Sequence, residues 1–197
     1  MTFNDLALAN EPAIRLAAFF GIFALMATWE AAAPRRTRLH SRTVRWTANL
    51  GLVVFNTVLV RLLFPFAAVA FAVLATQRGW GLLNNLALPD GLALVLAVVA
   101  LDFAIYLQHV MFHAVPVLWR LHRVHHADPD FDVTTGARFH PIEIVLSMLI
   151  KFSVIAVLGA PAAAVLVFEL LLNATAMFNH ANLKLPAGID AALRLLL

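Results

Sequence analysis

The sequence contains no cysteine among its 197 residues. This absence excludes disulfide bonds, iron–sulfur clusters, thiolate zinc sites and cysteine nucleophiles, so any bound metal must use nitrogen or oxygen ligands. Charged residues are also scarce at 13%, whereas hydrophobic residues make up 62% and the mean hydropathy is +0.87. Soluble domains carry about 25% charged residues. The composition therefore excludes an ordinary soluble domain and predicts an all-α, polytopic membrane protein whose apolar faces meet lipid.

The basic balance of the chain does not indicate a nucleic-acid partner. The pI is near 10.2, but the formal net charge is only +3. Many of the basic residues lie in one short segment, which contains Arg35, Arg36, Arg38, Arg42 and Arg45. Such an arginine density beside an apolar run marks the cytoplasmic side of a membrane protein. We therefore expect an integral protein of a bacterial inner membrane, with its N-terminus outside and no nucleic-acid partner.

Four to five segments of the chain are apolar enough to cross a membrane, which takes about 20 helical residues. The second of them exceeds one straight crossing and is expected to tilt or kink at Pro65. The last is long enough for a hairpin of two short crossings, because Gly159 and Pro161 form a helix breaker at its centre. The predicted spans are 13–33, 47–76, 91–113 and the hairpin 141–179.

Two charged residues lie inside the predicted hairpin. Lys151 and Glu169 stand nine residues on either side of Ala160, so an antiparallel hairpin would place them at the same depth. A charge at mid-membrane costs roughly 2.5–3.5 kcal/mol. We therefore expect the two side chains to form an ion pair. The alternative is that each reaches the interface separately or lines a cavity.

Seven of the eight histidines lie between residues 109 and 180. His109 and His113 are spaced i,i+4 at the end of a span, so both rings leave one helix face. The next three are spaced i, i+3, i+4, and the predicted topology brings all seven to the cytoplasmic interface. Imidazole suits iron, zinc, copper and nickel, so this clustering predicts a metal site. The candidate ligands are His109, His113, His122, His125, His126, His140 and His180.

A second polar pattern does not predict a metal site. Asp128, Asp130 and Asp132 alternate as in a calcium-binding loop. However, Val133 stands at the position where that loop needs glycine, and Phe139 stands at the twelfth position, where it needs a bidentate carboxylate. We therefore exclude calcium.

The histidines fall into motifs that resemble a known family. In chain order the motifs are HVMFH at 109–113, HRVHH at 122–126, RFHPIE at 138–143 and FNHAN at 178–182. Together they resemble the fatty acid hydroxylase/sterol desaturase superfamily of integral-membrane di-iron oxygenases. The resemblance covers about residues 90–197, and residues 1–89 would add N-terminal membrane helices and the arginine-rich loop.

The resemblance implies two iron ions, O2 as co-substrate, and hydroxylation or desaturation of a fatty acid, sterol or related lipid in lipid biosynthesis or modification. It assigns iron binding to His109, His113, His122, His125, His126 and His180. By the same resemblance His140 is a further ligand, or a group that hydrogen-bonds to one. Asp102 and Asn182 are expected to orient ligands through hydrogen bonds, with an ion pair to Arg61 as the alternative for Asp102.

The sequence departs from the family at its end. In members of that family, a stretch that looks like AALRLLL here leads into a last HxxHH box, but this sequence stops at Leu197. We therefore expect a truncated chain. Two other functions stay open, namely a non-catalytic remnant and a divalent-metal transporter, although a transporter should carry its ligands near the bilayer midplane.

The sequence shows no electron relay, because it has neither cysteine nor a glycine-rich nucleotide loop. We expect electrons from a separate ferredoxin- or cytochrome b5-like donor, and a lipid substrate that enters from the bilayer. Arg120, Arg123 and Arg138 lie beside the histidines. They are expected either to dock an acidic donor or to anchor the chain to anionic headgroups.

Overall fold

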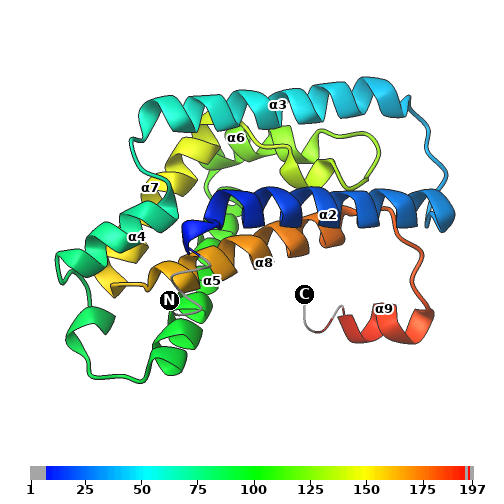
Figure 1. Cartoon of the computed structure of the whole chain (residues 1–197). Helices are drawn as coiled ribbons and strands as arrows, with labels where there is room; N and C mark the ends of the chain where they lie inside the picture. The colour runs from blue at the N-terminus through cyan, green and yellow to red at the C-terminus, as the bar shows by residue number, and fades with distance from the viewer. Residues whose placement is uncertain (1–7, 194, 196–197) are drawn as a thin grey trace.

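The computed structural model describes residues 8–193 and residue 195, so the sequence stretch 191–197 falls partly outside the described residues. Within the described part every regular element is a helix, and five helical segments are long and apolar enough to cross a membrane. The predicted all-α polytopic bundle of four to five spans is therefore confirmed. The elements in Figure 1 are α2 (Glu11–Ala32), α3 (Arg42–Leu63), α4 (Ala68–Gln77), η1 (Leu83–Asn85), α5 (Asp90–Ala114), α6 (Pro116–His126), η2 (Thr135–Ala137), α7 (Pro141–Leu158), α8 (Ala162–His180) and α9 (Ala187–Leu193).

The second span is broken into α3 and α4. Phe64, the residue before Pro65, is extended with φ −117° and ψ 118°, because a proline disfavours the helical conformation of the residue that precedes it. The expected kink is thus a full interruption. After it, α4 packs against both α7 and α8. Its fully buried Ala72 and Ala75 allow this close approach, since small side chains let helix backbones come together in membranes.

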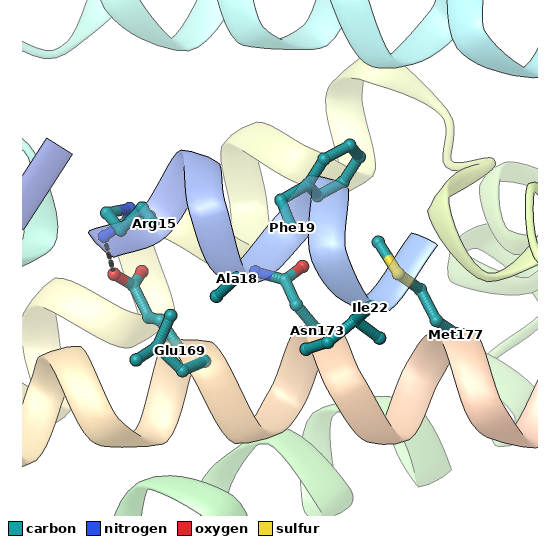
Figure 2. A pocket seen from close by; sticks show the side chains of 8 residues that line it. Arg15, Ala18, Phe19, Ile22, Glu169, Asn173 and Met177 are labelled. Carbon is teal, nitrogen blue, oxygen red and sulfur yellow. Dashed lines mark hydrogen bonds and ion pairs between the residues drawn. The ribbon is translucent and has the colours of Figure 1, made fainter. Parts of the chain in front are cut away.

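The predicted hairpin is present as α7 and α8. Gly159 ends α7 in the left-handed conformation with φ 70°, which a residue without a Cβ adopts at little cost. The predicted ion pair is confirmed, because Lys151 Nζ lies 2.5 Å from Glu169 Oε1. A third member is Arg15 of α2, whose guanidinium also donates to Glu169. Figure 2 shows this contact at one end of a pocket between α2 and α8.

One end of the bundle gathers the elements that carry the histidines. The C-terminal half of α5 is followed directly by α6, and these two helices pack together. Helix α8 packs against α5 and lies alongside α2 (Figure 1). The 3-10 turn η2, in the loop 127–140 between α6 and α7, contacts both α3 and α8. Helices from residues 1–89 therefore pack directly on the elements that hold the candidate site.

Candidate metal centre

Helices α5 and α6 bring four imidazole rings together. His109 and His113 lie in the last two turns of α5, as their spacing predicts. The Nε2 atom of His113 lies 3.2 Å from Nε2 of His109 and 3.3 Å from Nε2 of His126. One ring nitrogen each of His109, His113 and His122 lies within 4.8 Å of the others. Two nitrogens about 2.1 Å from one metal ion and at right angles around it would be ~3 Å apart, so this spacing fits shared coordination.

A second group of rings joins α6 to the end of α8. The Nε2 atoms of His125 and His180 face each other at 2.9 Å. The other nitrogen of each ring meets a backbone carbonyl, since His125 Nδ1 lies 3.2 Å from the Arg138 oxygen and His180 Nδ1 lies 2.7 Å from the Ala176 oxygen. A carbonyl oxygen only accepts, so Nδ1 carries the proton in both neutral rings. Two lone pairs then face each other, which is the arrangement that a metal ion stabilises.

A buried carboxylate orients the central ring. His122 Nδ1 lies 2.7 Å from Glu143 Oε1, and both side chains are buried. The carboxylate accepts the Nδ1 proton, so the lone pair is on Nε2. This Nε2 is buried without a hydrogen-bond partner among the described residues. An unsatisfied buried acceptor costs ~1–3 kcal/mol. The orphaned nitrogen beside His109 and His113 therefore fits a metal ligand.

The electrostatics of His125 and His126, the last two residues of α6, also favour metal binding. Burial, followed by repulsion from the neighbouring rings, lowers the pKa of His125 to about 3. Burial and the nearby rings of His122 and His113 also lower the pKa of His126. Both rings are thus neutral at pH 7, and a neutral imidazole is the form that binds metals.

The structure places the remaining predicted residues differently. His140 is the N-cap of α7, and its Nδ1 accepts the backbone N–H of Ile142 at 3.1 Å. Asp102 lies on the exposed surface of α5 and hydrogen-bonds to none of the described histidines, nor to Arg61. Asn182 is buried, but its side chain bonds the backbone of Arg36 on both sides at 2.9 Å. The groups that do orient the rings are Glu143 and the two carbonyls, and sequence reasoning missed all three.

The three arginines beside the histidines differ in whether they face solvent. Arg120 and Arg123 are exposed on α6, which leaves them open for docking or for headgroups. Arg138 points inward, because its Nε donates to the Val124 oxygen at 2.7 Å and its Nη1 to Asn49 Oδ1 at 2.8 Å. Arg138 therefore does not belong to the predicted docking surface.

Comparisons with known proteins agree with the motifs. Residues 94–195 match the family profile described as Fatty acid hydroxylase. Among curated proteins, an ornithine lipid hydroxylase, OlsE, of Rhizobium tropici is 27% identical over 100 residues, which is 51% of this chain and 30% of that protein. The chain thus spans less than a third of that relative's length. No solved structure matches.

Proposed function

The chain belongs to the fatty acid hydroxylase family, and from this premise we propose that it is a membrane-bound, O2-dependent enzyme that hydroxylates or desaturates a lipid. Two iron ions would be held by the histidine layer, which we define as His109, His113, His122, His125, His126 and His180. The observation that carries the proposal is the convergence of Nε2 atoms at 2.9–3.3 Å from rings on three helices. His140 stays a proposed further ligand.

The residues of the chain would have separate tasks. The bound irons would supply the O2 activation that cleavage of an unactivated C–H bond requires, since no side chain provides it. Glu143 holds the proton at Nδ1 of His122, and the carbonyls of Arg138 and Ala176 do the same for His125 and His180. These contacts fix each ring before metal binds. The apolar spans around the layer would exclude bulk water from the reacting carbon.

The position of the histidine layer suggests how the substrate binds. The layer lies at one end of the spans rather than at their centres, which suits a lipid whose chain lies in the bilayer and whose target carbon reaches the interface. It also argues against a transporter, whose sites lie near the midplane. The relative in Rhizobium tropici is named for hydroxylation of ornithine lipid, and this favours hydroxylation over desaturation. Electrons would come from an acidic donor docked at Arg120 and Arg123.

The activity is tested with purified, iron-loaded protein in lipid vesicles, supplied with 18O2, a reduced ferredoxin and total bacterial lipid. Mass spectrometry of the lipids should show one added labelled oxygen atom for hydroxylation, or loss of two hydrogen atoms for desaturation. The matched control is the His113→Ala/His125→Ala double variant. A chain extended by an HxxHH segment is assayed in parallel. Absence of product from both chains would contradict the proposal, and metal uptake into sealed vesicles would favour a transporter.

The proposed orientation places the N-terminus outside and the histidine layer at the cytoplasmic face of a bacterial inner membrane, as the arginine-rich loop suggests. Because the chain has no cysteine, single introduced cysteines report orientation without background. Exposed Thr37 lies in the loop between α2 and α3, and exposed Ala87 lies between η1 and α5, so one apolar segment, α3 with α4, separates the two loops. In intact cells an impermeant maleimide should label the Ala87→Cys variant and leave Thr37→Cys unlabelled. The reverse result would invert the orientation.

A further inference from the structure

The acidic loop after α6 contains a cation supplied by the protein itself. Arg45 of α3 is only 5% exposed. Its guanidinium holds both oxygens of Asp128, at 2.6 and 2.8 Å, and reaches Asp132 at 2.7 Å and the carbonyl of Asp130. The Asp128 carboxylate also accepts from the Thr135 hydroxyl at 2.7 Å. The alternating aspartates thus bind a guanidinium where a calcium loop would bind Ca²⁺.

This ion pair is connected to the histidine layer by two side chains. Asn49, one turn after Arg45 on α3, donates to Asp128 at 2.9 Å and accepts from Arg138 Nη1 at 2.8 Å. Arg138 also donates to the Val124 carbonyl at 2.7 Å. It is therefore held from both sides, and its own carbonyl is the group that meets His125 Nδ1 at 3.2 Å. Hydrogen bonds through Asp128 and Asn49, followed by the covalent side chain of Arg138, thus link Arg45 to the His125 ring.

Helix α2 supports the backbone beside His180, the ring that faces His125. Glu30 is fully buried, and its Oε1 accepts the backbone N–H of Val133 at 2.7 Å and that of Asn182 at 2.8 Å. Val133 belongs to the same acidic loop, and Asn182 follows His180 by two residues. One carboxylate oxygen therefore joins the loop behind His125 to the backbone behind His180.

We infer that Arg45 and Glu30 are positioning residues, which hold His125 and His180 face to face for metal binding. The inference rests on the proposed metal centre and adds how it is assembled. Both residues lie outside the 94–195 segment that matches the family profile. The α2–α3 region would thus complete a site whose ligands all lie in the matched segment.

The test is Co²⁺ titration of the full chain in detergent, with bound metal counted by elemental analysis and the absorbance of histidine-bound Co²⁺ recorded. Loss of an orienting group typically weakens metal binding ~10–100-fold. We expect Arg45→Ala to give this loss and the same altered spectrum as His180→Ala. The Arg45→Ala/His180→Ala double variant should lose little more, because both changes affect one pair. Methylguanidinium should restore the spectrum of Arg45→Ala, since it refills the place of the side chain.

Matched variants separate positioning from general instability. Arg61→Ala removes an exposed arginine from the same helix and should bind Co²⁺ as the unmodified chain does. Glu30→Gln keeps an acceptor oxygen and should retain most binding, whereas Glu30→Leu should lose it. If Arg45→Ala does not fold, Asn49→Leu keeps both partners of the Arg45–Asp128 ion pair and removes the hydrogen bonds of Asn49 to Asp128, Thr134 and Arg138.

The inference would be overturned if Glu30→Leu bound Co²⁺ with the affinity of the unmodified chain and Arg45→Ala or Asn49→Leu did so as well. Fully additive losses with His180→Ala would also overturn it. If the unmodified chain binds no Co²⁺ and no iron, the proposed metal centre itself fails, and the inference fails with it. Binding by the unmodified chain with normal binding by the variants would overturn the positioning role alone.

Discussion

The molecule has two clusters of ion pairs, which differ in the groups that they contact. In the mid-span cluster, Lys151 and Arg15 both pair with Glu169 inside the helical bundle. In the loop cluster, Arg45 in the first turn of α3 pairs with Asp128 and Asp132. The mid-span cluster joins three helices and has no hydrogen bond to a histidine among the described residues. The loop cluster continues through hydrogen bonds to His125. The comparison indicates that what a buried ion pair is attached to, more than its own strength, decides its role.

The largest effect on stability is expected from Glu169→Gln. Removal of this carboxylate leaves Lys151 and Arg15 facing a neutral amide, and loss of one partner of a buried pair costs about 3–5 kcal/mol. Unfolding in detergent, followed by circular dichroism, measures the loss, with Glu11→Gln as a control that breaks only a partly exposed pair to Arg15. The folded fraction should keep its Co²⁺ affinity. If Glu169→Gln lost as much Co²⁺ affinity as Arg45→Ala, the claim that only the loop cluster supports the metal centre would be wrong.

The next effect is expected from Glu143→Ala, which removes the acceptor that orients His122. Metal affinity should fall about 10–100-fold, while unfolding is perturbed less than in Glu169→Gln. Glu143→Gln still offers an oxygen to His122 Nδ1 and should retain more affinity than Glu143→Ala. Isothermal titration with Co²⁺ measures both variants. Equal affinity of all three proteins would show that the carboxylate does not orient the ring.

A smaller effect is expected from Gly136→Ala, which tests the seat of the acidic loop on α8. A Cβ at Gly136 would lie 2.5 Å from the Ala176 carbonyl oxygen, the atom that meets His180 Nδ1. Overpacking here should cost about 1–2 kcal/mol and shift the Co²⁺ spectrum. Gly188→Ala meets nothing within 4 Å and serves as the control. Identical thermal unfolding and spectra for both variants would contradict this packing.

The smallest effect is expected from Asp102→Asn. The side chain is exposed and reaches no histidine, so both stability and Co²⁺ affinity should change by less than about 0.5 kcal/mol. A tenfold loss of affinity would instead support the orienting role that the sequence suggested for Asp102.

Features with a local signature were predictable from the sequence. The spans follow from uninterrupted apolar runs, and the ring faces of α5 and α6 follow from the i,i+3,i+4 spacing of their histidines. The Lys151–Glu169 pair followed from their equal spacing about a helix breaker. Arg15 was missed because it lies 154 residues from Glu169 in the chain, and no sequence period links them.

The supporting contacts of the site were not predictable in the same way. The sequence alone groups Arg45 with the other arginines of a loop predicted to be cytoplasmic, because its charge is visible in the sequence while its burial is not. Asp128 and Asp132 were excluded as calcium ligands, but their partner lies more than 80 residues away. Glu143 is the acidic residue of the RFHPIE motif. A carboxylate within a histidine motif is a sequence signal from which its role in orienting a ligand could have been predicted.

The central claim is that the histidine layer holds metal through converging Nε2 atoms. The most direct measurement is iron per chain, by elemental analysis after anaerobic loading with ferrous iron and gel filtration in detergent. The account predicts that the unmodified chain retains iron, up to two ions per chain, and that His113→Ala/His125→Ala retains almost none. Equal iron in the two proteins would contradict it.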